Sequence, residues 1–236
     1  MGSFTSGHFA ELAIWYLVFV FSTTCHEAAH AWAAHKGGDP TAHAGGHVSL
    51  DPLPHIRRSP GGMVIIPILS FLFYGWMVGW ASVPLNPEWA RRYPGRSSLM
   101  ALAGPTANLL LALVAFGVIH ALLASNVLIP NYQSDSVFDL LTVPGGDTRS
   151  PLGAVARALS ILLMLNVLLW LFNLIPFPPL DGAAIVEGAS PRYAGSLYAR
   201  MREVPMVEIL GLLVAWRLFD YISTPALGIV VRLLFG

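Results

Sequence analysis

The sequence predicts an all-α polytopic membrane protein, a bundle of about four to six transmembrane or re-entrant helices with a small β element after the first helix. Hydrophobic residues make up 55% of the chain and charged residues only 11%. The mean hydropathy is +0.63, and the apolar residues gather in runs long enough to cross a bilayer. The formal net charge is zero, so composition gives no reason to expect a nucleic-acid partner.

The first apolar run predicts a helix over residues 9–35. No basic segment precedes this run and no obvious cleavage site follows it, so we expect a retained helix rather than a signal peptide. Gly37-Gly38-Asp39-Pro40 then breaks the helix. Residues 41–54 are rich in glycine and histidine and partly alternate between polar and apolar types, which predicts one or two strands or a hairpin.

The run over residues 61–83 is long enough to span a membrane, but Pro67, Gly75 and Gly79 interrupt it. Basic residues flank it on both sides, and the positive-inside rule therefore places both flanks in the cytoplasm. A single crossing would put one flank outside, so we expect a bent hairpin or a re-entrant element. The flanking basic residues are Lys36, Arg57 and Arg58 before the run, and Arg91, Arg92 and Arg96 after it.

Three further apolar runs complete the bundle. Residues 98–125 and 152–174 predict spanning helices, and the acidic segment 126–150 between them predicts an outer loop. The last run, residues 206–235, contains charged residues and a proline, and it fits either one broken span or a hairpin. We find no internal repeat and no linker to a second domain.

Two histidines and a glutamate stand at a fixed spacing near the end of the first run, in His26-Glu27-x-x-His30. On a helix the two histidines lie on one face, about one turn apart. They can hold one zinc ion at roughly 2.0–2.1 Å, and such an ion lowers the pKa of its water to about 7. Glu27 would lie beside the ion as general base. Ionisable groups in an apolar run are costly in a bilayer, which favours a metal centre over a solvent-facing helix end.

A third protein ligand is needed, because open zinc sites typically use three. The segment 173–182 offers a candidate. Prolines end the preceding helix there and leave an extended strip that must line a cavity. Asp181 follows on a turn, on the same side of the membrane as the histidines by the charge argument. Zinc, Asp181, Glu27 and two neutral histidines sum to zero charge, which suits a site of low dielectric. Lone Cys25 is expected to be a buried, inert thiol rather than a ligand.

Three motifs together resemble those of the site-2 protease family of intramembrane zinc proteases. They occur in that family's order within residues 9–182, and the segment 38–55 is similar to a compact prokaryotic branch of it. The resemblance implies zinc ligands His26, His30 and Asp181, the base Glu27, and supporting, substrate-binding roles for Asn108 and Asn173. The motifs are His26-Glu27-x-x-His30, Gly104-Pro105-x-x-Asn108 and Asn173-x-x-Pro176-x-Pro178-Pro179-Leu180-Asp181-Gly182.

The chain departs from that compact branch beside the metal motif. His47 stands where an arginine is usual, Asp51 stands where an asparagine is usual, and Arg57-Arg58 replace an acidic position after His55. These differences leave the ligand motif intact. They alter the region that we expect to border the substrate.

Several polar residues also allow a simpler interpretation. Asn173 and Asn166 are seven residues apart on one helix face, so they could simply join helices by hydrogen bonds. Four histidines crowd the same side of the membrane, and we expect them to be interfacial or to support the ligands rather than to bind the ion. These histidines are His35, His43, His47 and His55.

The sequence thus predicts one integral-membrane metalloprotease domain over residues 1–236, with a catalytic core near 9–182 and a C-terminal membrane segment at 206–236. It would use Zn²⁺ to hydrolyse peptide bonds of membrane-embedded substrates in a prokaryotic plasma membrane, with its site towards the cytoplasm. An extended substrate could pair with a strand near 47–50. The expected partners are that substrate, the lipid bilayer and a regulatory membrane protein, because the chain has no room for the family's extra modules.

Two other classes stay open from the sequence alone. A catalytically inactive, zinc-binding membrane scaffold would keep the ion without turnover. A histidine-ligated redox or transport protein would use the same histidines for other chemistry.

Overall fold

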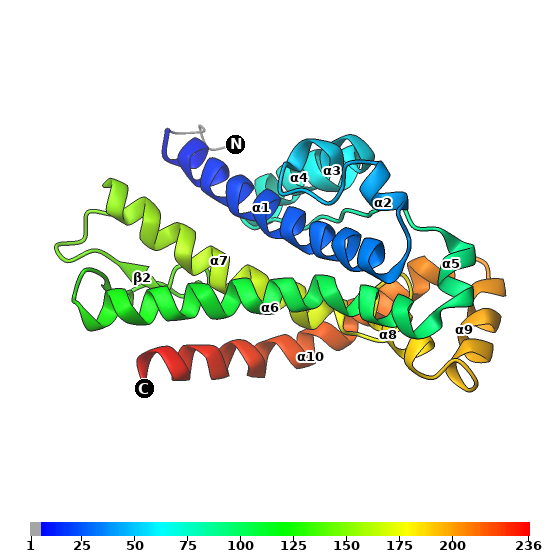
Figure 1. Ribbon diagram of the computed structural model, residues 1–236. Coiled ribbons are helices and arrows are strands. Elements are labelled where there is room, and N and C mark those ends of the chain that lie inside the picture. Colours follow the sequence, from blue (N-terminus) through cyan, green and yellow to red (C-terminus); the bar gives the residue numbers. More distant parts are fainter. Residues whose placement is uncertain (1–5) are drawn as a thin grey trace.

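In the computed structural model, the described part of the protein is residues 6–236, without the side chains at positions 6, 199, 202 and 203. Four long helices run along the length of the molecule (Figure 1). Within the described part, these four are the helices long and apolar enough to cross a membrane as single helices. They are α1 (Ser6–Gly37), α6 (Pro94–Ala124), α7 (Pro151–Asn173) and α10 (Val207–Phe235). The predicted class, an all-α polytopic membrane protein, is confirmed.

Local signals in the sequence set the ends of these helices. Prolines at the first turns of α6 and α7 start both helices, because their missing N–H is not needed there. α1 ends where Gly38 adopts a φ of +99°, a conformation that favours glycine. α10 continues through Pro225 as one helix, so the hairpin alternative for this run is wrong.

Residues 61–83, which were predicted to form a bent hairpin or a re-entrant element, form a bent hairpin. α3 (Pro52–Arg58) is followed by a π-helical turn, η1 (Gly61–Ile65), and α4 (Ile66–Tyr74), with a bend of 112° after α3. The chain then reverses at Gly75 and returns extended, with hydrogen bonds from Trp80 N–H to Gly62 C=O and from Val78 N–H to Ser70 Oγ.

The base of this hairpin returns to the end of α1. The Asp39 carboxylate accepts the Asn86 N–H at 2.9 Å, and the Trp89 indole donates to Gly37 C=O at 3.1 Å. Both flanks of the hairpin therefore lie at the same end of the molecule. A single crossing would separate them.

The strands predicted at residues 41–54 are absent, and that prediction is wrong. The segment forms α2 (Thr41–Ala44) and, after a bend, the start of α3. Asp51 caps α3 by accepting the Leu53 N–H, and Pro52 occupies the first turn. The small β element lies later in the chain, in the loop between α6 and α7. There β1 (Ile129–Pro130) pairs antiparallel with β2 (Leu141–Thr142).

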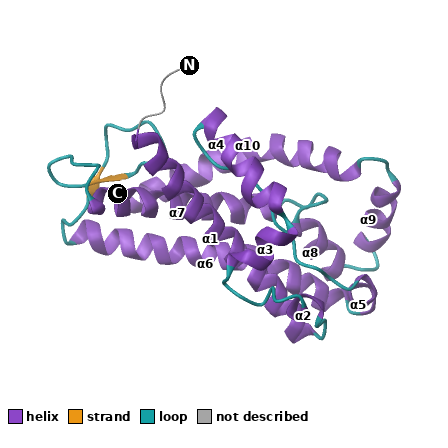
Figure 2. Cartoon of the chain, turned by 90° about the horizontal axis from the view of Figure 1, so that it is seen from above, coloured by secondary structure: helices purple, strands orange, loops and turns teal. Residues whose placement is uncertain are grey.

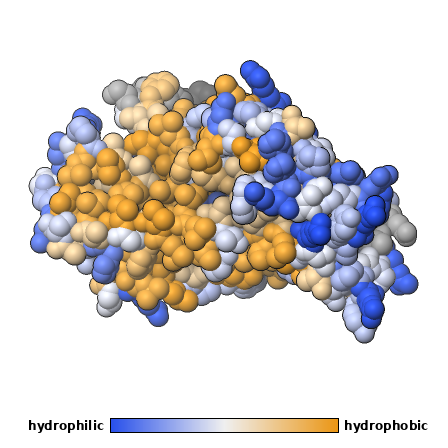
Figure 3. Space-filling model, viewed as in Figure 1, coloured by the Kyte–Doolittle hydropathy of each residue, from blue (hydrophilic) through white to orange (hydrophobic). Residues whose placement is uncertain are grey.

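Three short helices gather at the end of the bundle opposite the two strands, where Figure 2 shows α5 and α9. These helices are α5 (Pro87–Arg92), α8 (Asp181–Ala189) and α9 (Ala194–Glu203). Figure 3 shows the corresponding surface: an apolar band covers the long helices, and hydrophilic residues cover the end that carries α5 and α9.

The apolar core lies between α6, α7 and the end of α10, where Ile119, Leu163, Met164 and Leu234 are buried. At the strand end, Arg157 on α7 is ion-paired with Glu11 on α1 and lies 3.7 Å from the Asp139 carboxylate. The long helices are thus fixed against one another at that end. α1, α6 and α8 enclose a polar cluster nearer the other end.

Candidate metal centre

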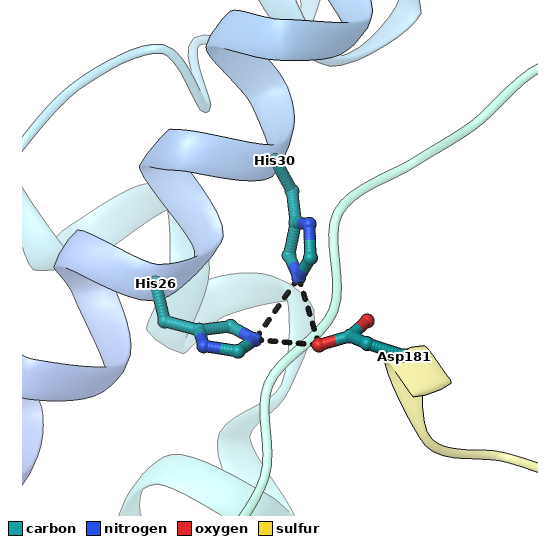
Figure 4. Close-up of side chains that lie close together, drawn as sticks. All are labelled: His26, His30 and Asp181. Atoms are coloured by element: carbon teal, nitrogen blue, oxygen red, sulfur yellow. Dashed lines mark hydrogen bonds and ion pairs between the residues drawn. The ribbon is translucent and has the colours of Figure 1, made fainter. Parts of the chain in front are cut away.

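The side chains of His26, His30 and Asp181 converge from α1 and the start of α8 (Figure 4). The two Nε2 atoms are 2.9 Å apart, and Asp181 Oδ2 lies 3.1 Å from one and 3.2 Å from the other. Among the described residues, this is the group of three or more His, Cys, Asp and Glu side chains close enough to share a metal ion. The structure thus brings together all three residues predicted as ligands.

Hydrogen bonds behind the rings orient both histidines. His26 Nδ1 faces Asn108 Oδ1, and His30 Nδ1 faces the Met100 carbonyl oxygen at 2.7 Å. Both partners are acceptors, so each ring carries its proton on Nδ1 and presents a lone pair at Nε2. The ring orientation and tautomer are those of zinc-ligating histidines.

The three converging atoms are therefore all acceptors. Asp181 Oδ2 is buried and has no hydrogen-bond partner among the described residues. Two lone pairs and a carboxylate oxygen repel one another in a buried site unless a cation lies between them. Two imidazoles and one carboxylate form a known donor set for catalytic zinc. The residues fit the ion that the sequence predicted.

Gly104 on α6 leaves the space that such an ion needs. A Cβ at this position would lie 2.3 Å from His30 Nε2 and 2.6 Å from His26 Nε2. In the sequence, Gly104 stands in the motif Gly104-Pro105-x-x-Asn108 that carries the family resemblance, and no separate role for it follows from the sequence. Its specific role requires the pairing of α1 with α6, which the sequence alone does not give.

Asp181 is positioned by contacts on both sides of it. α7 ends at Asn173, and the proline-rich segment leads into α8, of which Asp181 is the first residue. A Cβ on Gly182 would lie 2.4 Å from the Leu174 carbonyl oxygen, so the segment folds closely over the helix start. Ser98 Oγ donates to the Ile185 carbonyl and fixes α8 against α6.

Glu27 is buried at 6% exposure, beside the three ligands. Its carboxylate is within electrostatic range of His26, His30 and Asp181, and of the Arg58 guanidinium on α3. This is the position expected of a general base next to a zinc ion.

The two asparagines predicted to bind substrate have different surroundings. Asn108 is fully buried, faces His26, and donates to Asn166 Oδ1 at 2.8 Å, so it supports a ligand. Asn166 also donates to Ser22 Oγ, so it joins α7 to α1 as the simpler interpretation expected. Asn173 is partly exposed and donates to the Leu169 carbonyl, and no described contact links it to the metal ligands.

An extended stretch of chain follows the ligand-bearing face of α1. Phe19, His26, His30 and Gly37 lie within about 20° of one line along this helix. A Cβ on Gly79 would lie 2.5 Å from Phe19 Cζ, and a Cβ on Gly37 would lie 2.8 Å from Trp89 Cζ2. Residues 79–86 therefore run along α1 past the two histidines, as the extended stretch beside the cluster in Figure 4 illustrates.

Comparison with known proteins agrees with this site. A zinc-binding cluster with an adjacent glutamate, set in a bundle of apolar helices, defines a membrane zinc metalloprotease. Residues 14–215 match the model of peptidase family M50, and the chain belongs to this family, the site-2 protease family.

Two relatives are named as zinc metalloproteases. The chain is 32% identical over 176 residues to "Putative zinc metalloprotease YwhC" of Bacillus subtilis, which covers 74% of this chain and 68% of the relative. It is 28% identical over 138 residues to "Putative zinc metalloprotease Rip2" of Mycolicibacterium smegmatis, which covers 55% of this chain and 52% of the relative. No solved structure matches the chain.

Proposed function

We propose that this metalloprotease is a site-2 protease-like endopeptidase that cleaves membrane-embedded substrates within the bilayer. The observation that carries the proposal is the depth of the site. His26 lies eleven residues before the end of α1, or roughly 16 Å along a helix, and α1 is one of the four apolar helices. A peptide reaching His26 and Glu27 must therefore enter the apolar band.

We further propose that the substrate backbone lies extended beside residues 79–86. The strand expected at 47–50 is not formed, so it cannot serve as the pairing edge. Between Trp80 and Asn86, no backbone N–H or C=O is hydrogen-bonded within the described part of the chain. Such an edge can add a peptide strand, and an extended peptide exposes the carbonyl that a helix shields.

The chain's own residues supply the proton transfers and the positioning. Bound zinc would polarise the peptide carbonyl and acidify a water molecule. Glu27 takes a proton from that water and delivers it to the leaving amine. Asn108 and the Met100 carbonyl keep the two histidines in the productive orientation. Asn173, which lies next to the proline-rich segment, is proposed to contact the substrate.

The test compares Glu27→Gln with wild type, using purified protein and a single-span model substrate in liposomes. Glu27→Gln keeps zinc but loses cleavage, because the ligands are intact and the base is gone. Glu88→Gln, an exposed glutamate on α5, is the matched control and cleaves as wild type does. Equal cleavage by wild type and Glu27→Gln would refute the role of Glu27. Zinc without cleavage in wild type would favour the inactive scaffold, and haem absorbance without zinc would favour a redox protein.

The intramembrane location of cleavage has its own measurement. Mass spectrometry of the products maps the cut to the apolar segment of the substrate. A cut confined to its soluble tails would contradict intramembrane cleavage while leaving a zinc protease.

We also propose that the protein acts with a regulatory membrane partner in a prokaryotic cell and that its site faces the cytoplasm. The support for the orientation is the basic end of the molecule, where Lys36, Arg91 and Arg96 flank the ends of α1 and α6. In a Cys25→Ala background, a membrane-impermeant maleimide should label Gln133→Cys in intact spheroplasts but not Arg91→Cys. Labelling of Arg91→Cys alone would reverse the orientation.

A further inference from the structure

A second pair of buried histidines lies outside the metal centre. His47 follows α2 and His55 lies in α3, with exposures of 6% and 0%. Their rings are nearly perpendicular, with centroids 5.3 Å apart. Residues eight apart in the sequence thus place two buried imidazoles against each other, one of them on α3.

The nitrogens of this pair are largely without partners. His55 Nε2 donates to the Ser49 carbonyl at 3.3 Å, so its Nδ1 holds a lone pair. That Nδ1 and both nitrogens of His47 are buried without a hydrogen-bond partner among the described residues. Buried imidazole nitrogens normally have a partner, so an unfilled set of three requires an explanation.

A carboxylate lies close to the pair. Asp51 is the N-cap of α3 and stands four residues before His55 in the sequence. One Asp51 oxygen accepts the Leu53 N–H, and the carboxylate acts electrostatically on the His55 ring. Asp51 is exposed, and its second oxygen accepts no hydrogen bond from the described residues, so this oxygen is available to a bound cation.

We propose that His47, Asp51 and His55 form a second site for a divalent transition metal such as Zn²⁺, separate from the catalytic centre. Two imidazoles and one carboxylate are a donor set that such ions accept, with water completing the coordination. The ion satisfies the unpartnered nitrogens and joins the loop after α2 to α3. This inference does not depend on the proposed intramembrane activity.

The charges around the site set its strength. The Arg58 guanidinium acts on His47 and donates to Ser82 Oγ at 3.3 Å, and its charge opposes a cation. Burial and Arg58 lower the pKa of His47, which keeps this imidazole neutral at pH 7 and able to coordinate. Asp51 supplies the negative charge. The second site therefore binds zinc more weakly than the catalytic centre does.

The test counts zinc bound to the purified full-length chain in detergent by equilibrium dialysis against Zn²⁺ alone. Wild type takes up two ions, the second more weakly. Asp51→Asn keeps the helix cap, because asparagine also caps, but lowers affinity for the second ion about tenfold or more. His47→Arg removes that ion, and Arg58→Gln strengthens its binding.

Controls separate this site from the others. Asp181→Asn loses the first ion and keeps the second, so failure of the catalytic proposal is distinguishable. His35→Gln keeps both ions, because His35 belongs to an exposed stacked pair with His43. A thermal unfolding scan provides an independent readout: added Zn²⁺ raises the melting temperature of Asp181→Asn, and this rise is smaller when Asp51→Asn is added and absent when His47→Arg is added.

Three results would overturn the proposal. The first is that the wild-type protein binds one zinc ion, and no second, at every zinc concentration at which the protein stays in solution. The second ion could persist with unchanged affinity in both Asp51→Asn and His47→Arg. Loss of the second ion in His35→Gln would assign it to the surface pair.

Discussion

The two buried histidine pairs of this chain, His26–His30 and His47–His55, differ in what lies behind each ring. In the first pair both Nδ1 atoms face acceptors, and a carboxylate from a distant helix meets the two Nε2 atoms. In the second pair one nitrogen is bonded, and the carboxylate acts from a distance. A metal centre that is formed before the ion binds needs two oriented rings and a carboxylate in contact with them. The second pair has one oriented ring and no carboxylate in contact, so binding of the ion must complete the site.

The largest expected effect comes from removing the carboxylate of the first pair. Asp181→Asn should lose the catalytic zinc and reduce cleavage by about a hundredfold or more, because the ion loses its anionic ligand and only the neighbouring Glu27 then offsets its charge. Zinc content and cleavage rate are the measurements. Asp135→Asn, at an exposed position in the loop between α6 and α7, is the control and should match wild type. If Asp181→Asn kept its full zinc content and its full cleavage rate, the Asp181 carboxylate would not distinguish the first histidine pair from the second, and its role as a ligand would be refuted.

Filling the space next to the Nε2 atoms of the first pair should reduce zinc binding nearly as much. Gly104→Ala places a methyl group where the ion must lie, so the variant should lose most of its zinc. Gly117→Ala is the matched control on the same helix, since a Cβ there meets nothing within 4 Å. Elemental analysis measures the zinc content of both variants. Retained zinc in Gly104→Ala would show that the ion lies elsewhere.

Loss of an orienting bond should have a smaller effect. Asn108→Leu frees the His26 ring and should weaken zinc binding by about 10–100-fold. Asn173→Leu should leave zinc affinity unchanged, because Asn173 bonds only to the Leu169 carbonyl in the described contacts. If Asn173 binds substrate, its variant reduces cleavage alone. Equal zinc affinities for the two variants would refute the orienting role of Asn108.

The smallest expected effect is on stability, and it comes from Asp39 in the turn between α1 and α2. Asp39 is buried, and burial alone would raise its pKa. The N–H groups of Asn86 and Thr41 and the Thr41 hydroxyl outweigh this and lower the pKa below its usual range. The ionised form is thus favoured by folding. Its contribution is complete above the usual pKa of about 4 and is lost as the pH falls towards the lowered value.

Melting temperatures between pH 7 and pH 3 measure this contribution. Asp39→Asn should be less stable than wild type at pH 7, with a difference that narrows below pH 4. A constant difference across the range would exclude ionisation of Asp39 as the cause.

The sequence predicted the parts of the site that depend on local spacing. His26, Glu27 and His30 follow from one helix turn, and the long spans follow from hydropathy. Asp181 required the further argument that a broken helix must line a cavity. The roles of Gly104 and the Met100 carbonyl depend on how α6 meets α1, and no local pattern gives this contact.

The segment 41–54 shows where sequence patterns misled. Alternation of polar and apolar residues favoured strands, yet Asp51-Pro52 is itself a signal for a helix start. The Asp39 carboxylate also accepts hydrogen bonds from the N–H and the hydroxyl of Thr41, which fix the turn before α2. The edge that could pair with an extended substrate was consequently expected at 47–50, whereas the extended segment beside the two histidines is residues 79–86.

X-ray absorption at the zinc edge, on His47→Arg protein carrying one ion, identifies the atoms that bind the catalytic ion. Scattering from two imidazoles and from oxygen, with no sulfur, is expected at about 2.0–2.1 Å, and this signal should be lost in Asp181→Asn. A sulfur ligand at about 2.3 Å, or a spectrum unaffected by Asp181→Asn, would contradict this set of ligands.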